Sequence, residues 1–177
     1  MSYKLIFSGS GGQGVITAAI VLAEAAVLHE NLHAIQAQSY GPEARGGATR
    51  SDVIISKSPI NYPKVAHPDF LVCLTQESYD KFSRLVIPGG TILTDSRFVT
   101  PRRAADAKQK SCPMFETVME NFGNPIVHNI CMLGVVLRLT EIVKPESLMK
   151  VFEARMSPKF IDMNKKALQL GIDLPTG

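Results

Sequence analysis

The sequence predicts an α/β fold, with a doubly wound, mostly parallel sheet, helices on both faces and further helices at the C-terminal end. Short apolar segments alternate with segments of helical periodicity over residues 1–95, at the spacing of βαβ units. A glycine-rich turn joins the first strand to the first helix. The chain has 177 residues, 45% of them hydrophobic, and no linker or repeat divides it. We therefore expect residues 1–177 to form a single domain.

The first strand and helix surround a glycine turn. An apolar run at 5–7 leads into residues 9–14, and an apolar stripe with helical spacing follows from Val15 to Leu28. Glycine has no Cβ, so such a turn allows close approach of another group. The N–H groups and dipole of the following helix favour an anion there. The candidate binding residues of this loop are Gly9, Gly11, Gly12, Gln13 and Gly14.

Four further strands are predicted in the first half of the chain, at 33–39, 51–56, 69–75 and 91–95. The segment 69–75 is almost wholly apolar, as a central strand with both faces covered should be. Thr75 is a suitable N-cap for a helix over 76–85. Together these segments define the alternating part of the fold.

The pattern is less regular after residue 95. Residues 97–110 hold five basic side chains and are interpreted as a solvated surface or contact loop. Residues 126–143 are expected to be helical, with Gly134 marking close packing. Pro145 opens another helix, and Ser157-Pro158 opens the last one, which is expected to end at Gly171.

The composition disfavours several classes of protein. A net charge of +3 is too small to indicate a nucleic acid or an anionic membrane as the partner. No apolar run reaches the ~20 residues of a membrane span. No secretory signal is visible, so we expect a cytoplasmic location. Three separated cysteines and four histidines without ligand spacing predict no metal site in this chain.

The spacing Gly9-x-Gly11-x-x-Gly14 matches the dinucleotide fingerprint of Rossmann-like sheets. That site needs an acid at the end of the second strand to bind the ribose, and residues 35–39 contain neither an acid nor an arginine. This disfavours a self-sufficient dehydrogenase. A free-standing nucleotide-binding or sensor domain stays open, as does a simple tight turn. The P-loop and nucleophile-elbow motifs are absent, and we assign no catalytic residue.

A second unusual segment follows the second predicted strand. Loops after the first and second strands of such a sheet both lie at its carboxyl edge, so one cleft could hold both. The alternative is that its charged side chains only pair at the surface, which is worth less than ~1 kcal/mol. The candidate binding residues here are Tyr40, Gly41, Glu43, Arg45, Gly46 and Gly47.

Four segments in this order resemble the γ subunit of 2-oxoacid:ferredoxin oxidoreductases: SGSGGQGVITAAIVLAEAA, QSYGPEARGGATRSDVIIS, YPKV…PDFLVCLTQESYDKF and PGGTILTDS. Residues 129–134 are similar to the later Asn…Leu-Gly helix motif of that family. The resemblance covers most of residues 4–170. Residues 38–47 are most similar to the 2-oxoglutarate branch, and the pyruvate and branched-chain 2-oxoacid branches are close.

The resemblance implies a complex that oxidatively decarboxylates a 2-oxoacid with coenzyme A, giving an acyl-CoA, carbon dioxide and reduced ferredoxin. Thiamine diphosphate, Mg²⁺ and iron–sulfur clusters would lie on partners, namely thiamine-binding α and β subunits and a ferredoxin-like δ subunit. The γ subunit would contribute to the coenzyme A site through residues 11–14 and 40–47. Arg45, a planar cationic donor, would contact a phosphate or the pantetheine side of coenzyme A.

Overall fold

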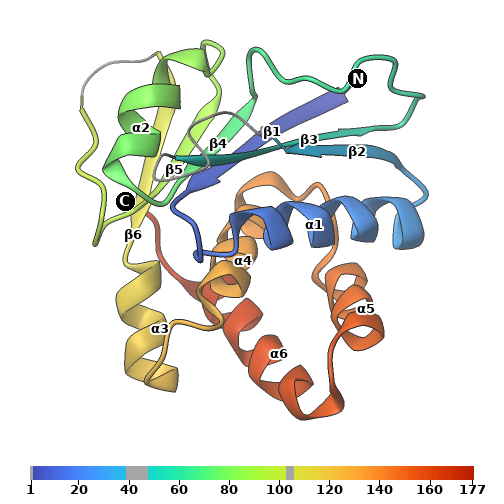
Figure 1. The fold of residues 1–177 in the computed structure, drawn as a ribbon, viewed down its shortest axis with the longest axis vertical. Helices are drawn as coiled ribbons and strands as arrows, with labels where there is room; N and C mark the ends of the chain where they lie inside the picture. The colour runs from blue at the N-terminus through green and yellow to red at the C-terminus, as the bar shows by residue number, and fades with distance from the viewer. Residues whose placement is uncertain (1, 39–47, 103–105) are drawn as a thin grey trace.

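The computed structural model describes residues 2–38, 48–102 and 106–177, and a twisted sheet forms its centre (Figure 1). The strands that the described residues form lie in the order β2-β3-β1-β4-β5-β6. Their bounds are β1 Ser2–Gly9, β2 His33–Gln38, β3 Thr49–Ser56, β4 Phe70–Cys73, β5 Thr91–Asp95 and β6 Lys108–Cys112.

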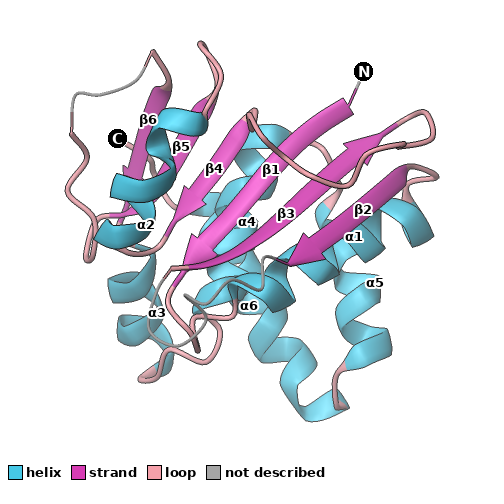
Figure 2. Cartoon of the chain, turned by 45° about the horizontal axis from the view of Figure 1, so that its top comes forward, coloured by secondary structure: helices cyan, strands magenta, loops and turns pink. Residues whose placement is uncertain are grey.

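Strands β1, β4, β5 and β6 are parallel, whereas β3 runs antiparallel to both β1 and β2 (Figure 2). The predicted α/β fold with a mostly parallel sheet is confirmed, and the structure adds β3 as an antiparallel insertion. The chain has only residues 39–48 to connect β2 to β3. A parallel crossover needs about a dozen residues or more, so the short connection favours the antiparallel pairing.

Helices cover both faces of the sheet unequally. The helix α2 lies on one face, and α1, α3, α4, α5 and α6 lie on the other (Figure 1). Side chains of β1 alternate accordingly: Leu5 and Phe7 belong to the core under α1 and α4, while Ile6 belongs to the core under α2. The helices are α1 Val15–His29, α2 Gln76–Phe82, α3 Met114–Phe122, α4 His128–Thr140, α5 Pro145–Arg155 and α6 Pro158–Asp173, with a 3₁₀ turn at Ser83–Leu85.

Several local predictions are confirmed. Thr75 is the N-cap of α2, and its hydroxyl accepts a hydrogen bond from the Ser78 N–H at 3.2 Å. Pro145 and Pro158 open α5 and α6. Helix α6 continues to Asp173, two residues beyond the predicted end at Gly171. None of the described helices has both the length and the hydropathy that a bilayer crossing requires.

Helices α4 and α6 touch through their backbones, as Gly134 predicts. A Cβ on Gly134 would overlap the carbonyl oxygen of Leu168, and a Cβ on Gly171 would overlap the carbonyl oxygen of Cys131. Because interiors are close-packed, any larger side chain at either position would force the two helices apart. The N-terminal end of α4 lies beside the glycine loop, where Asn129 contacts Gly14.

The interpretation of residues 97–110 as a loop is wrong for its last part, since β6 begins at Lys108. The strand lies at the edge of the sheet next to β5, which explains its polar composition. Its Ser111 exchanges backbone hydrogen bonds with Gly177, at 3.0 and 3.4 Å. Helix α3, which follows β6 directly, was not predicted.

Candidate functional site

The glycine loop connects β1 to α1 and is shaped by the side chain of Gln13. Its Oε1 accepts a hydrogen bond from the Ser10 N–H at 2.7 Å, and its Nε2 donates to the Leu74 carbonyl oxygen at 3.3 Å. The loop is therefore closed on itself and tied to the end of β4. Gly12 and Gly14 have φ angles of 87° and 72°, the left-handed region that glycine adopts without strain.

The four glycines of this loop have different surroundings. A Cβ on Gly9 would overlap Gln13 Oε1 and lie 3.3 Å from Leu74 Cβ, so this position is close-packed. A Cβ on Gly14 would lie 2.6 Å from Asn129 Nδ2. At Gly11 and Gly12, both exposed, no described atom lies within 4 Å of a Cβ. Gly9 and Gly14 therefore serve internal packing, whereas Gly11 and Gly12 expose their backbone to solvent.

A pocket of about 540 Å³ opens beside this loop, at the carboxyl edge of the sheet. Its walls come from the loop, the first turn of α3, the α3–α4 connection and the first turn of α4. The lining is mainly apolar, and His128 is its only titratable side chain among the described residues. The lining residues are Gly12, Gln13, Gly14, Phe115, Asn124, Pro125, Ile126, His128 and Asn129.

Behind the pocket, Asp95 and His128 form a buried pair. The Nε2 of His128 lies 2.8 Å from Oδ2 of Asp95, and the two side chains are 4% and 0% exposed. The carboxylate also accepts the Phe115 N–H at 2.8 Å and the Arg97 N–H at 3.0 Å. One side chain at the end of β5 thus positions the first turns of both α3 and α4.

This pair was not predicted from the sequence. The two residues are 33 positions apart. Asp95 lies in the segment PGGTILTDS, to which no role was assigned, and His128 lies in none of the quoted segments. The available signal was the position of Asp95, an acid at the end of an apolar strand, because carboxyl ends of parallel strands form the ligand-binding edge of such sheets.

Aromatic side chains continue the wall of the pocket outward. The Phe115 ring meets Phe98 and His128 edge to face, with centroid distances of 5.0 and 5.7 Å. Ile126, at the rim, is 64% exposed. The pocket therefore has a fixed aromatic wall and an apolar rim, a surface suited to hydrocarbon or ring contact.

Asn129 connects α4 to the glycine loop. Its Nδ2 donates to the Gly14 carbonyl oxygen at 3.4 Å. In the sequence, Asn129 begins a segment similar to a family motif, and no role was assigned to it. The structure gives it one, because the amide fills the space beside Gly14.

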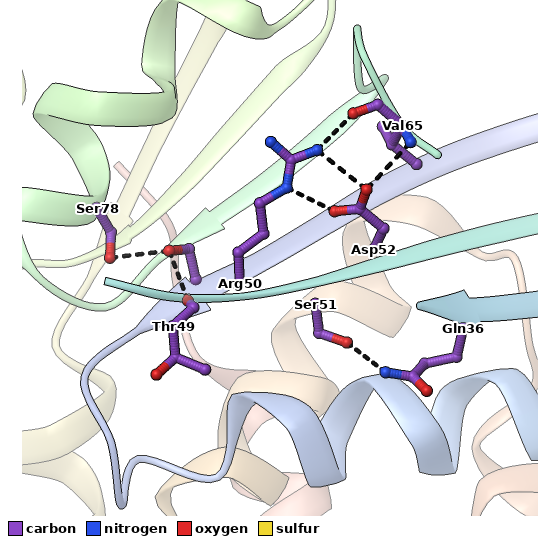
Figure 3. A network of polar contacts seen from close by, with 8 residues as sticks. Gln36, Thr49, Arg50, Ser51, Asp52, Val65 and Ser78 are labelled. Atoms are coloured by element: carbon purple, nitrogen blue, oxygen red, sulfur yellow. Dashed lines mark hydrogen bonds and ion pairs between the residues drawn. The ribbon is translucent and has the colours of Figure 1, made fainter. Parts of the chain in front are cut away.

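A second polar network lies on β3, the strand that follows residues 39–47 (Figure 3). Asp52 accepts two hydrogen bonds from the Arg50 guanidinium, at 2.7 and 3.0 Å, and a third from the Val65 N–H at 3.1 Å. Arg50 also donates to the Val65 carbonyl oxygen and lies over the Phe82 ring. This network fastens the β3–β4 connection to the sheet.

The predicted residues Tyr40, Gly41, Glu43, Arg45, Gly46 and Gly47 lie outside the described residues. The strand register nevertheless shows where the described chain ends and resumes. Gln38 pairs with Ser51, and Thr49 pairs with Gly9. Both flanks of the undescribed segment therefore lie at the same sheet edge as the glycine loop.

The structure also explains why the dinucleotide fingerprint is incomplete. Strand β3 lies between β1 and β2, so the end of β2 is not the neighbour of the glycine loop. Near that end, the Gln36 amide donates to the Ser51 hydroxyl at 2.7 Å, and no carboxylate is available in β2. This agrees with the interpretation that disfavours a self-sufficient dehydrogenase.

The cysteines are buried thiols. Burial raises the pKa of Cys112 and of Cys131 to about 12, and it also raises the pKa of Cys73. Over the described ranges, no group of three or more His, Cys, Asp or Glu side chains is arranged to hold a metal ion. The described residues therefore do not fit an iron–sulfur cluster or a structural zinc.

Comparisons with known proteins agree on one family. Residues 4–174 match the pyruvate ferredoxin/flavodoxin oxidoreductase family. The 2-oxoglutarate synthase subunit KorC of Methanocaldococcus jannaschii is 46% identical over 152 residues, which cover 85% of this chain and 81% of that protein. In Methanothermobacter marburgensis, the ketoisovalerate oxidoreductase subunit VorA is 34% identical and the pyruvate synthase subunit PorC 30% identical, each over 96% of this chain. The matched region is 36% of VorA and 96% of PorC.

The fold has a solved counterpart. The γ subunit of a keto/oxoacid ferredoxin oxidoreductase from Geobacter sulfurreducens superposes with a TM-score of 0.87 at 40% sequence identity, covering 97% of this chain and 96% of that one. A match of this extent, together with the family match over nearly the whole sequence, leaves one assignment. The chain belongs to the pyruvate ferredoxin/flavodoxin oxidoreductase family.

Proposed function

We propose that this chain is the γ-type subunit of a 2-oxoglutarate:ferredoxin oxidoreductase. The observation that carries the proposal is the order of the sequence identities: 36–46% to four KorC subunits, against 34–35% to two VorA subunits and 29–30% to two PorC subunits. The complex would convert 2-oxoglutarate and coenzyme A into succinyl-CoA and carbon dioxide, with reduction of ferredoxin. Pyruvate and branched-chain 2-oxoacids are the competing substrates that the assay must include.

The chain would act only within its complex. We propose that thiamine diphosphate, Mg²⁺ and the iron–sulfur clusters are bound by α, β and δ partner subunits, and that the complex is cytoplasmic. The lack of a fitting ligand set among the described residues supports this division. In VorA, a region similar to 96% of this chain makes up 36% of a longer polypeptide. Residues 1–177 would then act as one unit.

The contribution of this subunit would be part of the coenzyme A site. The exposed backbone at Gly11 and Gly12 beside a pocket supports a binding role for the glycine loop. Residues 40–47, with Arg45 as the cationic donor, are proposed from the sequence as the second part. Replacing Arg45 by alanine is expected to raise the KM for coenzyme A in the assembled complex, and an unchanged KM would count against that contact.

The test is purification of the tagged chain from its native cells under mild conditions. Mass spectrometry of the eluate is expected to find thiamine-binding and cluster-binding subunits. The eluate is expected to form succinyl-CoA from 2-oxoglutarate faster than it forms acetyl-CoA from pyruvate or isobutyryl-CoA from 2-oxoisovalerate. A chain that elutes alone and binds a free nucleotide would overturn the proposal in favour of a sensor domain.

A further inference from the structure

A second pocket lies at the edge of the sheet opposite to the glycine loop. Strand β1 has eight residues, so its start at Ser2 is about 20 Å from the loop that follows its end. The pocket has a volume of about 430 Å³, which is enough for a small molecule. Its lining shares no residue with the pocket beside the glycine loop, so the two cavities are separate.

The floor of this second pocket is one face of β1 and β3. In the strand register Lys4 pairs with Ile54, and one step outward Ser2 pairs with Ser56. All four residues line the pocket. Side chains two positions apart in a strand share a face, and Ile6 and Ile54 both belong to the core under α2. Lys4 therefore lies at the margin of that core, on the face that α2 covers further along the sheet.

The roof is the connection from β3 to β4, which crosses over β1 near its start (Figure 2). The beginning of this connection is held by Ser56, whose hydroxyl oxygen accepts the Ser58 N–H at 3.1 Å. Its later part is held at Val65, which donates its N–H to Asp52 and accepts a hydrogen bond from Arg50 (Figure 3). The roof is thus fastened on both sides of the residues that line the pocket.

Two lysines give this pocket its charge. Lys4 is half-buried on the floor, and Lys64 is exposed on the roof. Neither ammonium group forms an ion pair or a hydrogen bond with the described residues. The lining residues that the structure describes include no Asp or Glu. Because a charge that is partly buried without a partner is costly, the pocket has a positive charge that a bound anion would neutralise.

The other lining groups suit an anion with an organic body. The Ser56 hydroxyl accepts one hydrogen bond from the chain and retains its own proton for donation. The Asn61 amide is a further donor, without a hydrogen-bond partner in the described part of the chain. Ile54 and Ile60 supply apolar surface, and Tyr62 places a 66% exposed ring at the rim. A few polar groups beside apolar surface are typical of small-molecule sites.

We propose that this pocket is a second ligand site and that it takes a small organic dianion. Lys4 and Lys64 bind the charged groups, and the isoleucine surface contacts the carbon body. Dicarboxylates and phosphate monoesters share this chemistry, and an ammonium group acts on both as a point charge. The site lies a full strand length from the glycine loop, so it is independent of the proposed coenzyme A site.

The test is amide NMR of the isotope-labelled full-length chain, titrated separately with succinate and with phenyl phosphate to millimolar concentrations. At least one dianion is expected to shift the amides of residues 2–4, 54–56 and 59–64 in a saturable way, and the tighter of the two identifies the ligand class. The neutral diol of the same length as succinate should cause no shift. The absence of saturable shifts with both dianions, or shifts centred on residues 9–14, would overturn the inference.

Three variants test the assignment of the lysines. Lys64→Met removes one ammonium group from an exposed position and should weaken dianion binding about tenfold. Lys4→Met keeps the aliphatic stem on the floor and should have a similar effect. Lys57→Met is the matched control, because it removes an equal charge directly after β3 but outside this pocket, and it should leave the dissociation constant unchanged.

The comparison with the control decides between this pocket and a general attraction of anions to a basic surface. An equal loss of affinity in Lys57→Met and Lys64→Met would overturn the inference, and so would wild-type affinity in Lys64→Met. If Lys4→Met does not fold, Lys64→Met and the control still give this answer, since Lys57 and Lys64 are both exposed.

Discussion

The side chain of Asn129 occupies the space that a Cβ on Gly14 would need. The distance from that Cβ position to Asn129 Nδ2 would be 2.6 Å, and the same amide donates to the Gly14 carbonyl oxygen at 3.4 Å. Residues 115 positions apart therefore form one unit at the carboxyl edge. The shape of the glycine loop depends on α4 as well as on its own sequence.

Replacing Gly14 by alanine should destabilise the chain through both backbone strain and this contact. The left-handed φ of 72° alone costs a non-glycine residue about 1–2 kcal/mol. In a double-mutant cycle, Asn129→Ala should recover about 1 kcal/mol of the loss, because it removes Nδ2 and Cγ, the two atoms of Asn129 that lie closest to the new methyl group. Urea unfolding of the four variants measures this coupling, and strictly additive effects would show that the two residues do not interact.

Two glycine-to-alanine changes should have opposite outcomes. Gly171→Ala places a methyl group on the Cys131 carbonyl oxygen and should lower the free energy of unfolding by about 2 kcal/mol or more. Gly11→Ala meets no described atom and should be neutral or stabilising by up to about 1 kcal/mol. Chemical denaturation of both variants decides this. A Gly171→Ala variant as stable as Gly11→Ala would mean that α4 and α6 can separate without cost.

The Arg50–Asp52 pair should contribute far more than an exposed pair. Its side chains are 18% and 12% exposed, and Asp52 also receives the Val65 N–H. Asp52→Ala should cost about 3 kcal/mol, because it leaves a poorly solvated guanidinium and an N–H without a partner. Glu116→Ala removes the pair with Arg97, which is 58% exposed, and should cost less than about 1 kcal/mol. Urea unfolding of the two variants measures both free energies of unfolding. A similar loss of stability in both would show that the buried pair contributes no more than the exposed one.

Glu30 should make the stability of α5 depend on pH. It accepts the Ser147 hydroxyl at 2.6 Å and the Lys144 N–H at 2.9 Å, at the start of that helix. The Ser147 hydrogen bond, with smaller contributions from Lys144 and Lys150, lowers the pKa of Glu30 below its ordinary 4.5. A depressed pKa stabilises the fold above the unfolded-state pKa, and this stabilisation is lost as the pH falls through the lower folded-state value.

The matching experiment compares Glu30→Gln with wild type at pH 7 and pH 3. The variant should be less stable at pH 7, and the difference should shrink at pH 3. Glu153→Gln, at an exposed position on α5, is the control. If the difference in the free energy of unfolding between wild type and Glu30→Gln stays constant from pH 7 to pH 3, the carboxylate charge has no part in the contact.

The three thiols should be inert in the native state. Cys73, Cys112 and Cys131 are buried, and burial raises their pKa values, so the thiolate is scarce near neutral pH. A disulfide reagent at pH 8 should label fewer than one thiol per chain until urea is added. Rapid labelling of all three in the folded chain would contradict this burial.

Local patterns predicted most of the fold because they follow from single segments. The glycine turn, the cap at Thr75 and the helix-opening prolines each depend on neighbouring residues only. The strand β6 was not predicted, since an edge strand needs no apolar alternation and Lys108–Cys112 is mostly polar. The antiparallel β3 could have been inferred from the short connection after Gln38.

The candidate site was predicted less completely. The glycine loop was identified, but its glycines looked equivalent in the sequence. Only the structure shows that Gly14 is packed against Asn129, whereas Gly11 has no described neighbour within 4 Å of a Cβ. The Asp95–His128 pair joins a strand end to a helix start across 33 residues. No spacing rule predicts such a pair, because only the packing of α4 against the end of β5 brings the two side chains together.

We expect the complex that contains this chain to act on 2-oxoglutarate. The most direct measurement is ferredoxin reduction by the reconstituted complex with 2-oxoglutarate, pyruvate and 2-oxoisovalerate, each with and without coenzyme A. The highest kcat/KM is expected with 2-oxoglutarate, and ferredoxin reduction should depend on both coenzyme A and this chain. A higher kcat/KM with pyruvate or 2-oxoisovalerate, or full activity without the chain, would contradict it.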